Sequence, residues 1–172
     1  MMERQEYKNI IEAILFVSTK PVRIRQFSDI IGISPEEVKI LLEEMQQDYK
    51  NRGLQILQIA GGYQFATKPE YSEYIKKFIA TPASKLSKSA LETLAIIVYK
   101  QPITKPEIEK LRGVNVDGVI NTLLEKKLIK ISGRKNSPGR PFLFSTTEEF
   151  LTYFGINSLS ELPKLSDAED SF

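Results

Sequence analysis

The 172-residue sequence lacks the side chains that most often catalyse reactions near neutral pH. It contains no histidine and no cysteine. Histidine is the commonest general base at that pH, and zinc sites of the Cys/His kind need these residue types. The carboxylate pair Glu148 and Glu149 stands at the start of an expected helix, where the helix dipole accounts for it. The sequence therefore predicts no catalytic residue, no metal site and no cofactor, and favours a binding protein over an enzyme.

A nucleotide site is not indicated either. Gly61 and Gly62 are adjacent, but a phosphate loop would need the Gly-Lys-Ser/Thr ending that is missing here. The two glycines suit the turn of a β-hairpin instead. We therefore expect no nucleotide chemistry from this chain.

No segment predicts secretion or insertion into a membrane. The apolar run at residues 10–17 is interrupted by Glu12 and is not followed by a small-residue cleavage pattern. No stretch reaches the roughly 20 apolar residues that a helix needs to span a bilayer. Without cysteine no disulfide can form, so nothing argues for secretion. We expect a cytoplasmic protein with no membrane partner.

Contact with nucleic-acid phosphates is the remaining chemistry that the residue types allow. The formal net charge of +2 neither demands nor excludes it, because a local patch matters more than the sum. The stretch at 133–141 is basic, and Arg134, Lys135 and Arg140 are its candidates for weak DNA contact. Three positive charges without a basic helix support only weak, salt-sensitive binding. A solvated turn shaped by proline and glycine is the favoured interpretation.

The best-defined structural signal is a helix-turn-helix unit at residues 101–128. Thr104 and Glu107 form a capping box that starts a helix, and Gly113 is suited to end it in the left-handed conformation. Asn115 can cap a second helix. Two short helices joined by such a turn often read DNA. The charge of their exposed faces must decide whether this unit does.

The same pattern occurs twice along the chain. Pro102 lies 81 positions after Pro21, and Gly113 lies 81 positions after Gly32. Apolar positions coincide at the same spacing, in the pairs Phe27–Ile108, Ile33–Val114, Val38–Val119 and Leu42–Leu123. Coinciding apolar and turn residues are typical of a duplicated unit. Each half has the order helix, helix, turn, helix, two-stranded wing and helix, which is that of a winged-helix domain.

The sequence therefore predicts a mainly α fold with small β wings (α+β), built as two tandem winged-helix domains. The wing of the second domain is expected as strands near 128–132 and 142–145. The expected boundaries are 1–80 for the N-terminal domain, 81–86 for a linker, 87–163 for the C-terminal domain and 164–172 for a tail. The tail is polar and acidic, which predicts disorder.

The third helix of the first half is too acidic to read DNA. A reading helix normally presents Arg, Lys, Asn or Gln to phosphates and base edges. This helix carries Lys39 alone against five carboxylates, namely Glu36, Glu37, Glu43, Glu44 and Asp48. Phosphates would repel such a face. The corresponding helix of the second half has no arginine and a mixed, partly apolar face, so we expect its DNA contact to be weak or indirect.

The first helix has more apolar residues than one buried face needs. Its main stripe, at helical spacing, consists of Tyr7, Ile10, Ile11, Ile14 and Leu15. Ala13, Phe16 and Val17 fall off that stripe. A second apolar face predicts contact with another subunit. A helix buried on all sides within its own domain is the alternative interpretation.

Several segments resemble the segregation and condensation protein B family. They are residues 91–109 and 112–119, the Gly-Gly-Tyr-Gln sequence that begins at Gly61, the wing at 133–141, and residues 146–155. Taken in order, the likeness covers about residues 6–163. Together these motifs make the resemblance specific.

The resemblance implies an accessory subunit of the bacterial SMC condensin. Such proteins are tandem winged-helix homodimers that bind the kleisin subunit, segregation and condensation protein A. Through the kleisin they act with the SMC ATPase in chromosome condensation and segregation during cell division, and the ATPase hydrolyses the ATP. A nucleoid-associated, non-enzymatic protein is then expected. A DNA-binding transcriptional regulator with tandem winged helices is the alternative.

The resemblance and the residue pattern together suggest two interfaces. The first helix, with Ala13, Phe16 and Val17, is expected to pair two protomers. The C-terminal domain is expected to hold a kleisin segment through apolar positions, namely Ile96, Tyr99, Ile103, Val116 and Phe142. Docking of an extended or helical segment into a groove is a common mode of recognition.

Overall fold

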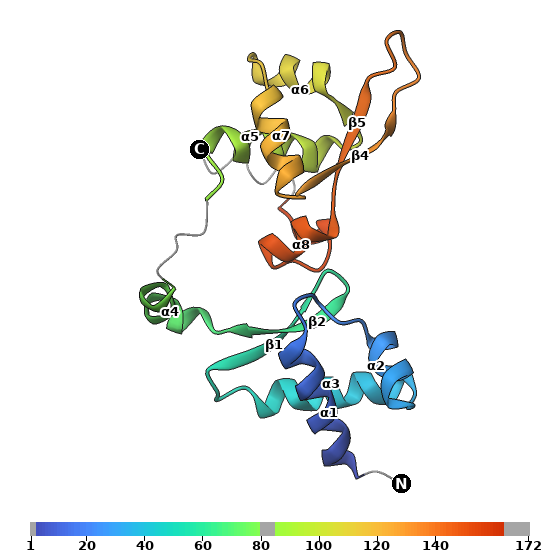
Figure 1. Cartoon of the computed structure of the whole chain (residues 1–172), viewed down its shortest axis with the longest axis vertical. Coiled ribbons are helices and arrows are strands. Elements are labelled where there is room, and N and C mark those ends of the chain that lie inside the picture. The colour runs from blue at the N-terminus through green and yellow to red at the C-terminus, as the bar shows by residue number, and fades with distance from the viewer. Residues whose placement is uncertain (1–2, 80–84, 164–172) are drawn as a thin grey trace. The chain divides into compact units, whose positions relative to one another are not determined.

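The computed structural model describes residues 3–79 and 85–163, which form two compact units (Figure 1). The first unit consists of residues 3–79 together with residues 155–163, and the second of residues 85–154. The predicted tail at 164–172 and residues 81–84 of the predicted linker lie outside the described residues. Leu86, which was also assigned to the linker, is buried in the second unit.

The first unit has the order of elements expected for a winged-helix domain. It contains α1 (Arg4–Val17), α2 (Ile24–Ile31), α3 (Pro35–Asp48), β1 (Leu54–Ile59), β2 (Gly62–Thr67), the 3-10 turn η1 (Pro69–Tyr71) and α4 (Ser72–Phe78). A second 3-10 turn, η2 (Leu159–Glu161), lies in the segment that returns to this unit.

Capping signals in the sequence explain why α2 and α3 are separate helices. The Ser34 hydroxyl accepts a hydrogen bond from the Glu37 backbone N–H at 3.2 Å, and the Glu37 carboxylate accepts one from the Ser34 backbone N–H at 3.0 Å. Gly32 ends α2 with a φ of 78°, a conformation that favours glycine. A tight turn between the two helices follows from these local preferences.

The hairpin turn lies one residue earlier than predicted. Ile59 pairs with Gly62, so the turn residues are Ala60 and Gly61, whose φ angles are 50° and 75°. Gly62 belongs to β2, where an added Cβ atom would lie 2.9 Å from the backbone carbonyl carbon of Pro21. Glycine at this position is therefore explained by the close approach of two backbones and not by the turn.

The core of the first unit forms where α1, α2, α3 and the hairpin meet. Its fully buried side chains include Ile11, Leu15, Phe27, Val38 and Leu42. Leu41 and Met45 of α3 are 3% and 2% exposed. Tyr7 of α1 packs half-buried against the same cluster. The buried residues of α3 therefore belong to the core of their own unit, and Met45 also lines a hollow of about 340 Å³ beside α1.

Residues 155–163 pack with the first unit, although the sequence analysis placed them in the second domain. The Ala60 backbone N–H donates to the Ile156 carbonyl at 3.2 Å, and the Gly61 backbone N–H donates to Asn157 Oδ1 at 2.7 Å. The second bond joins positions 96 residues apart. Local sequence patterns carry no information about contacts at such a separation.

The second unit repeats the winged-helix order and adds a strand. It contains α5 (Lys88–Lys100), β3 (Ile103–Thr104), α6 (Lys105–Arg112), α7 (Asp117–Glu125), β4 (Ile129–Arg134), β5 (Phe142–Thr146) and α8 (Glu148–Phe154). The sheet order is β3-β5-β4, and both pairings are antiparallel. The two wing strands were predicted. The short β3 was not, because two residues are too few for an alternating pattern.

The predicted helix-turn-helix corresponds to α6 and α7. The Thr104 backbone N–H donates to the Glu107 carboxylate at 2.9 Å, and Gly113 ends α6 with a φ of 70°. The Asn115 side chain accepts a hydrogen bond from the Asp117 backbone N–H at 3.0 Å. The capping box of α6 is the one expected from the sequence, whereas the N-cap of α7 is Val116, so Asn115 lies one residue before the cap.

The duplication is visible in the strand contacts as well as in the helices. Val22 forms a β-bridge with Tyr63 in the first unit, and Ile103 pairs with Phe144 in the second. Both members of the pair are shifted by 81 positions. The chain is therefore mainly α with small β wings, in two winged-helix units, as the sequence predicted.

Candidate protein-interaction surfaces

The third helix of the first unit presents carboxylates to solvent. Exposed on α3 are Glu36, Glu37, Glu43 and Asp48. Glu44 accepts a hydrogen bond from Arg4 at 3.2 Å and forms a 3.0 Å ion pair with Lys8. The hydrogen bonds from these two side chains lower the pKa of Glu44 to about 2, because they stabilise the ionised form. The helix face is acidic at neutral pH and would repel phosphates.

Two of the three basic residues predicted to contact DNA are engaged within their own unit. The Arg134 guanidinium lies 4.0 Å from the centre of the Phe142 ring, in a cation–π contact. Lys135 pairs with Glu107 of α6, and its hydrogen bond is the largest cause that lowers the pKa of Glu107 to about 2. Arg140 is exposed in the loop of the wing. These contacts favour a wing whose charges mainly stabilise its own shape.

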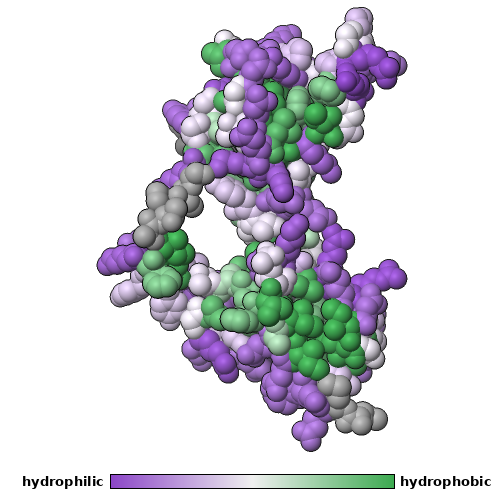
Figure 2. Space-filling view, in the orientation of Figure 1, coloured by the Kyte–Doolittle hydropathy of each residue, from purple (hydrophilic) through white to green (hydrophobic). Residues whose placement is uncertain are grey.

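An apolar hollow lies beside α1 in the first unit. It has a volume of about 330 Å³ and is lined by Asn9, Glu12, Ala13, Phe16, Tyr49, Leu54 and Phe65. Phe16 is 80% exposed, and the neighbouring Val17 is 75% exposed. Figure 2 shows hydrophobic side chains gathered on this unit over α1 and toward the hairpin. The hollow, together with Phe16 and Val17 at its edge, is thus accessible to a partner protein.

The geometry of α1 explains why this face is unfilled. Ile11 and Leu15 point into the core and are 0% and 1% exposed. Ala13 and Phe16 lie on the opposite side of the helix, where both are exposed. The Tyr49 and Phe65 rings, 5.0 Å apart, belong to the lining. The structure therefore brings Ala13 and Phe16 together, with Val17 exposed beside them.

Sequence reasoning missed the part of the hollow that the hairpin contributes. Leu54 begins β1 and is 39% exposed, and Phe65 of β2 is half-buried. For this part of the chain the sequence predicted only a hairpin. An apolar side chain at the exposed start of a strand was the available signal.

The helix α4 also exposes apolar side chains. Tyr74 is 72% exposed and Phe78 is 89% exposed, and no residue of α4 is buried. The two side chains are one helical turn apart and therefore share a face. Nothing in the described residues covers this face.

The five residues predicted to hold the kleisin do not form one exposed surface. Val116 and Ile103 are 1% and 5% exposed, because Val116 packs into the core beneath α7 and Ile103 joins the sheet. Tyr99 and Phe142 are 37% and 41% exposed, and Ile96 is half-buried. Contacts with a partner are therefore available to the latter three. Ile103 and Val116 are buried and do not contact a partner directly.

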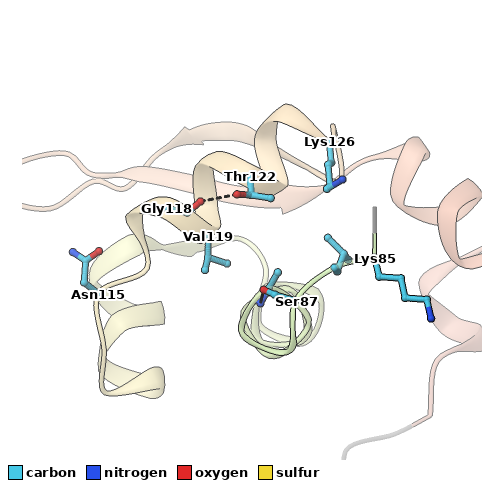
Figure 3. Close-up of a pocket in the computed structure, with 9 residues that line it drawn as sticks. Lys85, Ser87, Asn115, Gly118, Val119, Thr122 and Lys126 are labelled. Atoms are coloured by element: carbon cyan, nitrogen blue, oxygen red, sulfur yellow. Dashed lines mark hydrogen bonds between the residues drawn. The ribbon is translucent and has the colours of Figure 1, made fainter. Parts of the chain in front are cut away.

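A groove runs between α7 and the chain segment that leads into α5. Its volume is about 470 Å³, and its lining consists of Lys85, Leu86, Ser87, Ala90, Asn115, Gly118, Val119, Thr122 and Lys126. Figure 3 shows Lys85 and Lys126 at one end of this groove and Asn115 at the other. None of the lining residues was predicted from the sequence to bind a partner, although Val116 adjoins them in the chain.

The Thr122 and Ser87 hydroxyls in the groove form hydrogen bonds with nearby backbone groups, and the floor of the groove is apolar. The Thr122 hydroxyl donates to the Gly118 carbonyl at 2.9 Å (Figure 3), and the Ser87 hydroxyl accepts from the Ala90 backbone N–H at 3.1 Å. Leu86 and Ala90 are 8% and 2% exposed. A Cβ atom added at Gly118 would meet nothing within 4 Å. The groove is therefore open above α7 and suited to apolar contact.

An internal arginine fixes the first turns of α5 beside the groove. Arg112 Nη1 donates to the Ser89 carbonyl at 2.7 Å and to the Thr93 hydroxyl at 2.6 Å. Its other terminal nitrogen lies 2.9 Å from a Glu92 carboxylate oxygen. Thr93 is fully buried. This fork holds α6 against the first turns of α5, where Ala90 lines the groove.

Neither metal ligation nor membrane insertion is indicated by the described residues. At residues 3–79 and 85–163, the acidic side chains form no group that could hold a metal ion. In the same ranges, no helix has the length and apolar character required to cross a bilayer. The surfaces that remain to be explained are therefore the apolar hollow, the groove and the exposed face of α4.

Comparisons with known proteins all point in one direction. The model of the family described as segregation and condensation complex subunit ScpB matches residues 9–165. Segregation and condensation protein B of Symbiobacterium thermophilum is 49% identical over 158 residues, covering 91% of this chain and 72% of that protein. The protein of the same name from Bacillus cereus is 49% identical over 173 residues, covering 98% of this chain and 91% of that protein.

One similar solved structure is described as a dimer of the ScpB N-terminal domain complexed with ScpA peptide. It is 32% identical, and the match covers 44% of this chain and 96% of that chain. The TM-score is 0.42. The sequence matches extend much further along this chain than this structural one.

Proposed function

Since this chain belongs to the family of the segregation and condensation complex subunit ScpB, we propose that it is a non-enzymatic accessory subunit of the bacterial SMC–kleisin condensin. Its direct partners are a second copy of itself and the kleisin, segregation and condensation protein A. It reaches the SMC ATPase through the kleisin. It acts in the cytoplasm, on the nucleoid, in chromosome condensation and segregation during cell division.

One observation carries the choice of a protein partner over DNA. In both units the third helix, which would enter the DNA groove in a DNA-reading winged helix, lacks a basic face. On α3 four of the eight exposed residues are carboxylates and one is a lysine, and α7 lines an apolar-floored groove. Binding to phosphates needs the opposite distribution of charge.

Self-association is assigned to the hollow beside α1. Phe16 and Val17 expose an apolar surface that water would leave if a second copy covered it, and burial of apolar area is favourable. Ala13 is small enough to let a partner approach the helix closely. Tyr49, Leu54 and Phe65 extend the surface toward the hairpin.

Phe16→Glu tests this assignment. We expect the variant to be a folded monomer by light scattering, because Phe16 is 80% exposed and contributes little to its own core. Ile30→Glu is the matched control, since Ile30 of α2 is 64% exposed but lies outside the hollow. The assignment is rejected if both variants keep the mass of the unchanged protein.

Kleisin contact is assigned to the second unit, at Tyr99, Phe142 and the half-buried Ile96. Phe142 already carries the Arg134 guanidinium on its ring, which holds the ring in place for contact with a partner. Substituting the buried Val116 would damage the core and would not report on binding. Tyr99→Ala and Phe142→Ala are the informative changes, because both side chains are partly exposed.

Light scattering of the protein alone and mixed with its kleisin tests the proposed function directly. We expect a dimer alone and a heavier, stable complex in the mixture. A gel-shift series against salt separates this function from that of a transcriptional regulator, which would bind DNA at submicromolar concentration with steep salt dependence. Such binding without a kleisin complex would overturn the proposal.

A further inference from the structure

The last helices of the two units differ in how they are anchored. In the second unit α8 buries Phe150, which is 2% exposed and belongs to the core. At the spacing of 81 positions, Pro69 takes the place of Phe150 in the first unit. There η1 comes first, α4 begins only at Ser72, and no residue of α4 is buried. The first unit therefore lacks the aromatic anchor that holds the last helix of the second.

A helix as short as α4 depends on packing for its stability. It has seven residues, whereas isolated helices shorter than about 12–15 residues are marginal in water. Tyr71, Tyr74 and Phe78 are spaced by three and four positions, so they share one side, which we call the aromatic face of α4. They are 41%, 72% and 89% exposed. Contact of this face with another apolar surface would supply the missing stability.

The chain leads α4 away from the hollow of its own protomer. Thr67 ends β2 opposite Leu54, which lines the hollow, and the Lys68 backbone N–H donates to the Gly53 carbonyl at 3.3 Å. Beyond this bond η1 directs the chain outward, and Figure 1 shows α4 standing apart from α1. A return to the same protomer's hollow would break η1 and its bond to Gly53. The hollow of a second copy can receive α4 without such a change.

A dimer that used the hollow alone would bury little aromatic area. On a scale of about 200 Å² for a whole aromatic side chain, Phe16 at 80% exposure supplies roughly 160 Å². On the same scale, Tyr74 and Phe78 supply roughly 300 Å². A stable interface buries about 800 Å² on each partner. The aromatic face of α4 is therefore needed to approach that size.

We propose that α4 is an arm that packs Tyr74 and Phe78 into the hollow beside α1 of a second copy, while the arm of that copy enters the hollow of the first. The hollow offers apolar and aromatic contacts, from Phe16, Tyr49, Leu54 and Phe65. Each protomer gives one helix and receives one, as a twofold-symmetric interface requires. The inference rests on the proposed self-association and names the element that completes it.

Because the chain contains no cysteine, single engineered cysteines can locate the arm. Asn9 lines the hollow, and the Lys77 ammonium lies 6.0 Å from the centre of the Tyr74 ring. Full-length Asn9→Cys and Lys77→Cys chains, co-expressed and treated with a short bismaleimide, should give a covalent dimer with one copy of each, which mass spectrometry identifies. Lys39→Cys replaces Asn9→Cys in the control, because Lys39 is exposed on α3 outside the hollow.

Other products would overturn the inference. A cross-link between two copies of Lys77→Cys, in place of the mixed product, would mean that two α4 helices pair with each other. A cross-link within one chain of the double variant Asn9→Cys/Lys77→Cys, without a covalent dimer, would mean that the arm folds onto its own hollow. A dimer that forms no link between positions 9 and 77 would reject the arm as well.

Phe78→Glu gives an independent measurement. We expect the dissociation constant of the dimer, measured by sedimentation at several concentrations, to rise at least about tenfold, because each dimer loses two aromatic anchors. The fold should survive, since Phe78 is 89% exposed, and circular dichroism checks this. Lys76→Ala is the matched control on the same helix, because Lys76 pairs with Glu73 at 3.2 Å and lies off the aromatic face.

The possible results separate the arm from the proposed function. If Phe16→Glu is a monomer and Phe78→Glu dimerises as tightly as the unchanged protein, the arm is rejected while self-association through the hollow stands. If the unchanged protein is itself a monomer, both fall together. A weaker dimer with Phe78→Glu that Lys76→Ala does not reproduce supports the arm.

Discussion

In the first unit Val38, Leu41 and Met45 of α3 are buried, whereas in the second unit the equivalent positions of α7 line an open groove. Both units use the same devices to place that helix, because Gly32 and Gly113 end the second helices at equivalent positions. Met45 is buried where its counterpart Lys126 lines the groove. The comparison shows that equivalent positions in the same order of elements can be buried in one unit and line a groove in the other.

The wings differ in a second way. In the first unit the turn of the hairpin is bound by Ile156 and Asn157 from the returning segment. In the second unit the wing carries its own contacts, from Arg134 to Phe142 and from Lys135 to Glu107. Neither wing therefore resembles the free basic wing that contacts phosphates.

The largest expected effect comes from exchanging the residues at one pair of equivalent positions. Met45→Lys puts an ammonium group where the native side chain is 2% exposed. We expect a loss of about 2–3 kcal/mol in the free energy of unfolding, because an ammonium group in place of a buried apolar side chain is costly to desolvate, even beside the carboxylates of the hollow that Met45 lines. The reverse change, Lys126→Met, should stay within about 1 kcal/mol, since Lys126 lies at the groove surface. Urea denaturation of both variants measures the two values.

Equal effects of the two exchanges would contradict the comparison. They would mean that positions 45 and 126 have similar surroundings, and the groove would lose its basis. Hydrogen exchange resolved by peptide adds a check, because Met45→Lys should raise exchange in the first unit before the second.

The sequence predicted the helices, turns and wings of both units, but few of the contacts between segments that are far apart in the chain. Capping boxes at Ser34 and Thr104 and the glycine stops act within a few residues, so their signals are local. Because the two halves are related by a spacing of 81 positions, the local signals found in one half supported the same fold in the other. The pairing of Gly61 with Asn157, by contrast, depends on contacts formed only after folding.

The same limit explains which site residues were found. Phe16 was predicted because a helix has a fixed periodicity, and its exposure agrees with that pattern. Val116 was predicted to lie on a binding surface because it is apolar, but it is buried. Periodicity distinguishes the two sides of a helix. It does not tell which apolar residue at a helix start turns inward.

A smaller effect should follow from breaking the contact that distinguishes the first wing. Asn157→Ala removes the side-chain oxygen that accepts the Gly61 N–H at 2.7 Å. We expect a loss of about 0.5–1.5 kcal/mol, the usual net contribution of one hydrogen bond. Amide exchange at Gly61, followed by NMR, should become faster. Asn136→Ala in the exposed loop of the second wing is the control. Unchanged exchange at Gly61 in Asn157→Ala would show that the returning segment does not hold the hairpin.

The smallest effect concerns two carboxylates that link different elements in the two units. Glu44 joins α3 to α1 and Glu107 joins α6 to the wing, and both have a pKa lowered to about 2 from 4.5. A lowered pKa in the folded state stabilises the protein above the unfolded value of 4.5, and this stability is lost as the pH falls toward 2. Both groups are exposed, so the effect should be modest and should shrink in high salt.

Each glutamine variant should flatten the acid response of its own unit alone. Glu107→Gln should reduce the loss of protection in the second unit between about pH 5 and pH 2, and Glu44→Gln should do so in the first. Hydrogen exchange measured separately for the two units tests this, with an NMR titration of each carboxyl as the direct reading. If Glu107 titrates near its ordinary value, then Lys135 is not held on α6. The wing would in that case present its basic residues freely, and weak DNA contact through Lys135 and Arg140 would become the better interpretation.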